Sequence, residues 1–110
     1  MAWFVYLLRC RDGSIYIGTT TDPARRFREH AGALGRGAKY TAAKKPERFE
    51  SVFEVPDRSG ALRLEARLKK LSHAQREALA AGGPLPSDAP EARRVALSPD
   101  GTETLEAGSL

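Results

Sequence analysis

Cysteine is nearly absent from this sequence, and long apolar runs are absent altogether. Among 110 residues there is one cysteine, Cys10, which excludes an internal disulfide framework and a Cys-x-x-Cys zinc site and suits a reducing compartment. No apolar run approaches the roughly 18 residues that a membrane span needs. The segment Met1 to Leu8 also lacks the basic flank and the small-residue cleavage site of a signal peptide. We therefore expect a cytoplasmic protein without a membrane partner.

Composition and length also exclude a disordered chain and a multidomain one. The chain is 41% hydrophobic and 29% charged, which is ordinary for a globular protein and too apolar for disorder. Its 110 residues match one compact domain, since domains usually have about 100 to 200 residues.

Charge is distributed unevenly along the chain. The net charge is +4, but residues 83–110 hold two arginines against five acidic residues, so that this part carries −3 and residues 1–82 carry +7. We predict a domain over 1–82 and an acidic, proline-rich tail over 83–110. Such a basic domain is typical of proteins that bind a polyanion, although a solvated basic surface would have the same composition. Within the tail, 93–97 and 102–105 could pair as a small hairpin, or the tail could be loose.

A β-hairpin is predicted at the N-terminus. Two runs rich in β-branched and aromatic residues, 4–10 and 15–17, flank the sequence Arg-Asp-Gly at 11–13, which is a turn signal. The loop length decides where the tyrosines point. A two-residue loop places Tyr6 and Tyr16 on opposite faces, whereas a three-residue loop with Gly13 in the left-handed conformation pairs Leu8 with Tyr16 and Tyr6 with Gly18. Sequence allows both registers, and we favour the second.

A helix is expected after the hairpin. Asp22 followed by Pro23 is typical of an N-cap and a first helical position. A helical stripe predicts the buried side, formed by Ala24, Phe27, Ala31 and Leu34. The other side then carries Arg25, Arg26, Arg28, Glu29 and His30. Residues 35–46, with four cations and no acid, are predicted to form a flexible basic loop.

One more strand and two helices complete the predicted order. Alternation predicts a half-buried strand whose buried side chains are Phe49, Phe53 and Val55 and whose exposed ones are Arg48, Glu50 and Glu54. Leucines at helical spacing predict a helix over 61–71, and the Ser72 and Gln75 capping box predicts a short helix from 73 to about 81. The fold class is therefore α/β (α+β), with a small, central, mainly antiparallel three-stranded sheet flanked by helices.

At this point the sequence resembles a family, the GIY-YIG endonucleases, and most closely their small standalone members. The resemblance covers about residues 3–80. The residues that carry it are Val5-Tyr6, Tyr16-Ile17-Gly18, Arg26, His30 and Glu65. The first motif reads Phe4-Val5-Tyr6, so phenylalanine replaces its glycine, while the second motif is intact.

The resemblance implies a role for each of these residues. Glu65 is the implied ligand of one Mg²⁺ (or Mn²⁺), since a hard carboxylate with waters suits that ion. Arg26 would hold a phosphate oxygen with its guanidinium. Of Tyr6 and Tyr16, one would deprotonate or orient the attacking water and the other would position the water or the phosphate. The resemblance assigns the base to Tyr6, although a phenol of pKa ~10 is a poor base until a nearby cation lowers that pKa. His30 would orient the site or contact the phosphate.

Several cations and one aromatic residue are candidates for nucleic-acid binding. They are Arg9, Arg25, Lys39, Tyr40, Lys44 and Lys45. Arg9 could flank the catalytic face or lie at a strand edge, and the Lys39-Tyr40 segment suits stacking on a base or a plain surface loop. Structural alternatives also exist within the motif, because strand tyrosines often pack in a core and Glu65 could pair with Lys69 at i+4.

Together these features predict a metal-dependent endonuclease acting on DNA, with RNA not excluded. The resemblance alone implies branched, nicked or otherwise distorted substrates, as in DNA repair. The main alternative is a nucleic-acid-binding module that has lost turnover, in line with the altered first motif. A protein-interaction domain is less favoured because it leaves the Tyr, Arg and Glu pattern unexplained.

Overall fold

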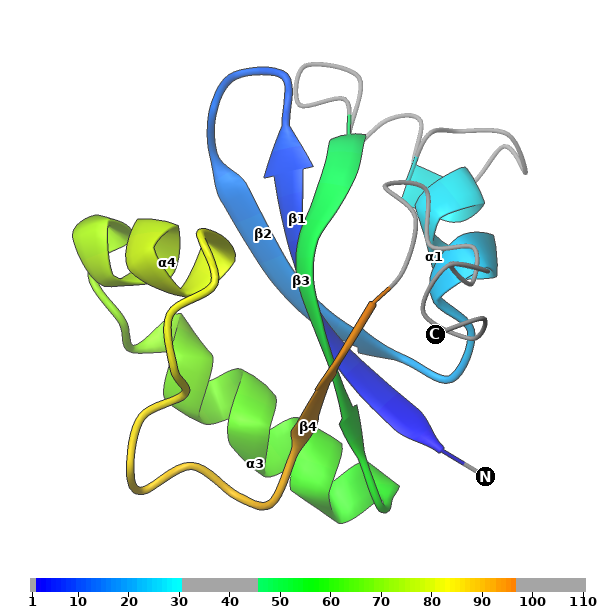
Figure 1. Ribbon diagram of the computed structural model, residues 1–110. Coiled ribbons are helices and arrows are strands. Elements are labelled where there is room, and N and C mark those ends of the chain that lie inside the picture. The colour runs from blue at the N-terminus through cyan, green and yellow to red at the C-terminus, as the bar shows by residue number, and fades with distance from the viewer. Residues whose placement is uncertain (1, 31–45, 97–110) are drawn as a thin grey trace.

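The computed structural model describes residues 2–30 and 46–96, which form a sheet with helices on both faces (Figure 1). The element order is β1 (Trp3–Cys10), β2 (Ile15–Thr20), α1 (Pro23–His30), β3 (Pro46–Val55), α3 (Arg58–Lys69), α4 (His73–Ala80) and β4 (Arg93–Val95). The strand order across the sheet is β2-β1-β3-β4, and every neighbouring pair is antiparallel. The predicted α+β class with a small antiparallel sheet is confirmed. Over 2–30 and 46–96, no helix is long and apolar enough to cross a membrane.

The N-terminal hairpin has the favoured three-residue register. Tyr6 pairs with Gly18 and Leu8 with Tyr16. Gly13 lies in the loop with φ +88°, in the left-handed region that a side chain rarely adopts. Both phenols therefore lie on the same face of the sheet.

Strand β3 differs from the predicted alternation. Its register against β1 shifts between Leu7, which pairs with Ser51, and Leu8, which pairs with Phe49, so Glu50 is the extra residue of a β-bulge. Because an inserted residue reverses the side of everything beyond it, Phe49 and Phe53 lie in different core clusters on opposite faces. The prediction of one half-buried face was wrong, and β3 is buried on both faces across Ser51–Phe53.

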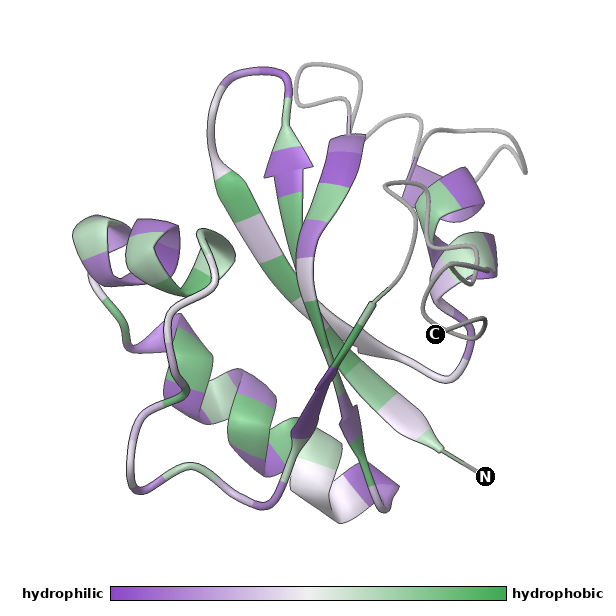
Figure 2. Ribbon diagram, viewed as in Figure 1, coloured by the Kyte–Doolittle hydropathy of each residue, from purple (hydrophilic) through white to green (hydrophobic). Residues whose placement is uncertain are grey.

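Two hydrophobic clusters cover the two faces of the sheet. On one face the buried side chains of β1 and β2 pack against Ala61, Leu64 and Leu68 of α3 and Leu79 of α4. On the other face Tyr6, Leu8, Phe49 and Val52 pack with Phe27 of α1. Figure 2 shows the hydrophobic colouring concentrated along the strands and the inner side of α3, while α1 is largely hydrophilic.

The predicted helix starts are present. At α1 the backbone N–H of Arg25 donates to Asp22 at 3.2 Å. Helix α3 begins at Arg58, three residues before the predicted start, because Asp57 caps it by accepting from Gly60 N–H at 2.8 Å. The Ser72 and Gln75 capping box opens α4 as predicted. Ala31, Leu34 and the basic loop up to residue 45 lie outside the described residues.

The sheet has a fourth strand where three were predicted. Residues 93–95 pair with β3, with Val95 opposite Val52. The connecting segment packs against the α3 side of the core through Leu85, Ala89 and Ala92. This strand lies within the segment 93–97, one arm of the small hairpin that the sequence allows, but its pairing with the distant strand β3 has no local signal in an acidic, proline-rich context. The proposed partner segment 102–105 lies outside the described residues.

Candidate active site

The hydroxyl of Tyr6 lies at the centre of the candidate site. Tyr6 is fully buried in β1, and its hydroxyl accepts from Arg26 Nε at 3.2 Å and lies 3.0 Å from His30 Nε2. Arg26 and His30 are four residues apart on α1, so one helix face presents both to the strand. His30 is 7% exposed, which corrects its predicted position on the exposed side of this helix. Contact with Tyr6 makes burial of this polar ring possible.

Gly18 makes room for this arrangement. It lies opposite Tyr6 in the hairpin, and a Cβ placed there would lie 2.7 Å from Tyr6 Cζ. Real side chains do not approach so closely, so any larger residue would displace the phenol. The glycine of the second motif is therefore required by packing against the tyrosine of the first.

Tyr16 and His30 border an open groove beside this cluster. The Tyr16 ring centroid lies 6.1 Å from that of Tyr6. It lies 4.9 Å from that of His30, and these two rings meet edge to face. The groove measures about 440 Å³ and runs between the end of β2 and α1. Its lining comprises Trp3, Tyr16, Thr19, Thr20, Thr21, Asp22, Arg25, Arg26, Glu29 and His30. Tyr16 thus presents a phenol to the groove, whereas Tyr6 lies beneath it.

Burial controls the protonation of the central groups. Desolvation raises the pKa of Tyr6 to about 12, although the hydrogen bond from Arg26 opposes the rise. Desolvation, with the nearby Arg26 charge, lowers the pKa of His30. Since His30 is then neutral near pH 7, the Tyr6 O–H can donate to His30 Nε2 while its oxygen accepts from Arg26. The hydrogen bond to Tyr6 also raises the pKa of Arg26, which stays charged.

Glu65 reaches this cluster electrostatically from α3. Its side chain is 20% exposed and pairs with Lys69 at 3.3 Å, as the structural alternative predicted. Its charge nevertheless contributes to the raised pKa of Tyr6. No group of three or more potential metal ligands occurs within 2–30 and 46–96. The resemblance implies Glu65 as the single protein ligand, and one carboxylate completed by water is a donor set that fits Mg²⁺.

Comparison with known proteins identifies the family. A GIY-YIG catalytic domain model matches residues 2–78. The chain belongs to the GIY-YIG family. It is 48% identical over 79 residues to a UPF0213 protein of Cupriavidus pinatubonensis, covering 72% of this chain and 86% of that relative. A UPF0213 protein of Vibrio cholerae is 49% identical over 83 residues, covering 73% and 78%. The solution NMR structure of the UPF0213 protein BH0048 from Bacillus halodurans is 43% identical, with a TM-score of 0.48, covering 76% of this chain and 89% of that one.

The GIY-YIG family consists of endonucleases that generally use divalent metals, so membership suggests a nuclease with a nucleic-acid substrate. The departure at Phe4 lies outside the polar cluster. Phe4 is half-buried, pairs with Thr20 and packs against the cluster on the α1 face. In this GIY-YIG domain the altered motif position therefore serves packing.

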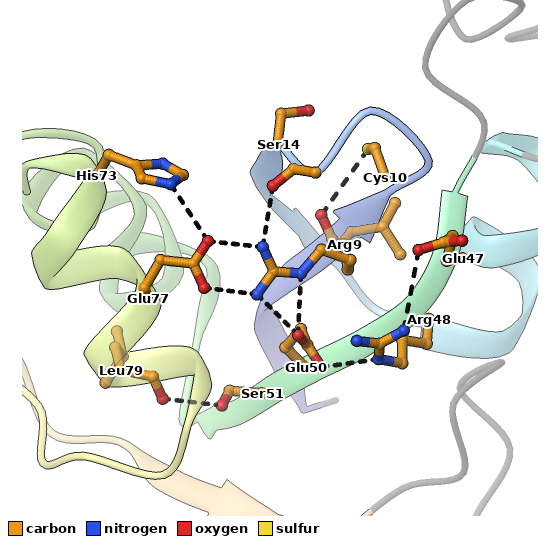
Figure 3. A network of polar contacts seen from close by, with 12 residues as sticks. Arg9, Cys10, Ser14, Glu47, Arg48, Glu50, Ser51, His73, Glu77 and Leu79 are labelled. Atoms are coloured by element: carbon orange, nitrogen blue, oxygen red, sulfur yellow. Dashed lines mark hydrogen bonds and ion pairs between the residues drawn. The ribbon is translucent and has the colours of Figure 1, made fainter.

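Arg9 does not lie in the candidate site. Its guanidinium donates to Glu77 twice at 2.6 Å, to Glu50 at 3.0 Å and to the Gly13 carbonyl at 2.9 Å (Figure 3). These contacts raise the pKa of Arg9, chiefly through Glu77, and the side chain is 14% exposed. Arg9 joins β1, β3 and α4, and this geometry does not favour the predicted contact with nucleic acid.

Of the other predicted nucleic-acid contacts, the described residues include only Arg25. It is exposed, lines the groove and pairs with Glu29 at 3.3 Å. Lys39, Tyr40, Lys44 and Lys45 lie outside the described residues.

Sequence reasoning missed the groove residues Trp3 and Thr19–Thr21. Trp3 is the single tryptophan of the chain, and the threonines are consecutive. Both signals were visible in the sequence. Only the hairpin register and the turn into α1 bring them beside Arg26.

Proposed function

We propose that this GIY-YIG protein is a divalent-metal-dependent endonuclease that hydrolyses phosphodiester bonds in branched, nicked or otherwise distorted DNA. The observation that carries the proposal is the Tyr6 hydroxyl held between Arg26 and His30 beside the groove that Tyr16 borders. A burial site for one tyrosine would need only one hydrogen-bond partner. Two partners, one of them permanently charged, and a second phenol at the groove instead resemble a preorganised site for a charged reaction.

Arg26 is the residue that would stabilise the phosphate. Its Nε is fixed by Tyr6 and one terminal nitrogen by Glu29 at 3.1 Å, yet the side chain is 40% exposed and lines the groove. A guanidinium fixed in this way can offer its remaining donors to a nonbridging oxygen with little loss of side-chain entropy. Its contact would strengthen as negative charge develops during hydrolysis.

Glu65 is the residue that would hold Mg²⁺ or Mn²⁺. When bound, the ion supplies Lewis-acid stabilisation of the phosphate and a more acidic water. Lys69 competes for the same carboxylate through its ion pair. The Lys69 side chain is 54% exposed, so solvent weakens the pair and metal binding can replace it at small cost.

The two tyrosines would have different tasks. Tyr6 is fully buried and its pKa lies near 12, which opposes direct contact with water and proton removal near pH 7. We therefore assign Tyr6 the positioning of Arg26 and His30. Tyr16, which borders the groove, would orient the attacking water and relay its proton, passing its own hydroxyl proton to solvent in the open groove as it accepts the proton of the water.

The test is cleavage of labelled flapped, nicked, branched and linear DNA by the full-length chain, with and without Mg²⁺ or Mn²⁺, alongside an RNA of the same sequence. We expect cleavage of the branched, flapped or nicked DNAs only when the metal is present. Glu65→Gln should abolish this cleavage and preserve DNA binding, because phosphate contacts by Arg and Lys dominate affinity. The matched control is Glu54→Gln, whose carboxylate pairs with Arg93 on the β3–β4 side and which should cleave normally.

Binding without any cleavage would instead indicate a nucleic-acid-binding module that has lost turnover. The Phe4 departure from the first motif is the observation in its favour. Cleavage by Glu65→Gln at the wild-type rate would exclude this carboxylate as the metal ligand.

A further inference from the structure

Part of the groove lining has no task in the proposed reaction. Trp3, the Thr19–Thr21 run and Arg25 line the same groove as Tyr16 and Arg26. We propose that these residues bind one unpaired nucleotide next to the cleaved bond, with its base stacked on Trp3. The inference rests on the proposed function and adds to it a physical basis for selecting distorted DNA.

Trp3 is suited to be a stacking platform. It is half-buried, packs against the hydrophobic cluster on the α3 side of the sheet and is one of the residues that line the groove. The core thus anchors this residue at the border of the groove. Stacking on such a platform accepts every base, because each has a π-face.

Apart from Arg26, which is assigned to the phosphate, the polar lining fits a base. Arg25 pairs with Glu29 at 3.3 Å and Asp22 adds a second carboxylate, so these remaining charged residues sum to no excess positive charge. A track for the DNA backbone would need that excess. Threonine hydroxyls and carboxylates beside guanidinium groups instead supply the mixture of donors and acceptors that a base edge requires.

The geometry of the turn supports a fixed binding surface. The Thr20 hydroxyl accepts from Asp22 N–H at 3.0 Å and donates to the Asp22 carbonyl at 3.2 Å. Asp22 in turn caps α1 through Arg25 N–H. The threonine run and Arg25 are therefore held in one rigid corner between β2 and α1, which lowers the entropy cost of binding.

The dimensions of the groove are compatible with an unpaired base. At about 440 Å³, the groove is within the usual range for one small ligand, roughly 300 to 1,000 Å³. A base inside an intact duplex is stacked on both sides and cannot reach Trp3 without leaving the helix, which costs its stacking and pairing. Flaps, nicks and branches offer bases for which this cost is small.

Trp3 is the single tryptophan, so its fluorescence reports directly on stacking. The full-length protein is titrated in EDTA, where cleavage cannot occur, with a flapped DNA and with a fully paired duplex of the same sequence. Anisotropy of a label on the DNA measures binding in parallel. We expect the flapped DNA to quench the tryptophan emission as it binds, and the paired duplex to bind with little quenching.

Variants test the energetic contribution. Trp3→Leu should weaken binding of the flapped DNA by about tenfold or more and hardly change binding of the duplex, while Trp3→Phe should retain most of the affinity. The control is Leu62→Ala, an exposed position on α3 outside the groove. If Trp3→Leu fails to fold, the quenching of the wild-type tryptophan emission still shows whether a base stacks on Trp3. Flapped DNA that binds without quenching would overturn the stacking site alone, whereas no binding to any DNA would overturn the proposed function as well.

Discussion

Single residues in this protein combine packing with chemistry. Tyr6 fills the core and organises Arg26 and His30 through one hydroxyl, while Gly18 is small so that this phenol fits. Tyr16, which pairs with Leu8 in the same hairpin, borders the groove. The two tyrosines of the motif therefore carry the same hydroxyl group but differ in burial, since Tyr6 lies in the core and Tyr16 lines the groove.

Removing each hydroxyl should separate these roles. Tyr16→Phe should leave the melting temperature unchanged and lower the cleavage rate by about 100-fold or more, as expected for loss of a group that assists proton transfer. Tyr6→Phe should lower both stability and rate, because it removes the hydroxyl that Arg26 and His30 share. Thermal unfolding and single-turnover cleavage measure the two effects. A Tyr16→Phe enzyme with the wild-type rate would return Tyr16 to a packing role.

His30 should make the fold sensitive to mild acid. Its folded pKa lies below the ordinary 6.5, so the unfolded chain binds the proton first. Its contribution to stability is thus present above pH 6.5 and is lost as pH falls through the folded pKa. Urea unfolding at pH 7.5 and 5.5 should show a smaller loss of stability in His30→Gln than in wild type. Equal losses in both proteins would contradict this.

At the scale of elements, the hairpin and α1 form the candidate site, and ion pairs hold the opposite part of the sheet together. Arg9 of β1 contacts Glu50, the bulge residue of β3, and Glu77 of α4 (Figure 3). Glu50 thus interrupts the strand pairing at the bulge and accepts a hydrogen bond from Arg9 at the same point. Helix α4 contributes only Leu79 as a fully buried side chain, so this network supplies much of its attachment.

Arg9→Met should therefore loosen α4 and the bulge. We expect the melting temperature to fall by about 5 °C or more, because two carboxylates lose their shared cation. Arg48→Met is the matched control, since Arg48 also pairs with Glu50 at 3.0 Å but is 48% exposed, and its loss should change the melting temperature by about 1 °C or less. DNA affinity and its salt dependence should be unchanged in both variants. A clear loss of affinity in Arg9→Met alone would restore Arg9 to the nucleic-acid interface.

On the scale of the whole molecule, the segment after residue 82 completes the sheet. Arg94 donates to Ser51 at 2.9 Å, and its guanidinium lies over the Phe53 ring at 4.8 Å. Arg67 of α3 pairs with Asp88 at 3.0 Å. That residues 1–82 form a domain of their own stays a prediction. Removing the segment after residue 82 would break these contacts, at a cost in the free energy of unfolding.

Two truncations measure that cost. A chain ending at Gly83 loses β4 and the packing of Leu85, Ala89 and Ala92, and we expect its melting temperature to fall by several degrees. A chain ending at Ala96 keeps all of these contacts and should unfold close to the full-length protein. Identical unfolding of the two would mean that 1–82 is an independent domain.

Most of the helices and strands, and the motif, are encoded locally in the sequence. Asp22-Pro23, the capping box at Ser72 and the leucine spacing of α3 act locally, through backbone hydrogen bonds and helical periodicity, so they can be read without neighbours. The resemblance rested on Tyr6, Tyr16-Ile17-Gly18, Arg26, His30 and Glu65, and the match over residues 2–78 confirms the family.

Which of these residues come into contact depends on long-range packing. The bulge at Glu50 arises from pairing between strands distant in sequence, and it reversed the predicted sides of β3. Burial of His30 and the separation of Arg9 from the site depend on which partners the fold brings near them, the Tyr6 hydroxyl for His30 and the Glu77 carboxylate for Arg9. The joining of β4 to β3 and the placing of Trp3 beside Arg25 are likewise long-range packing outcomes. Such contacts leave no local periodic signal, because their energy comes from surfaces that are buried between segments far apart in the sequence.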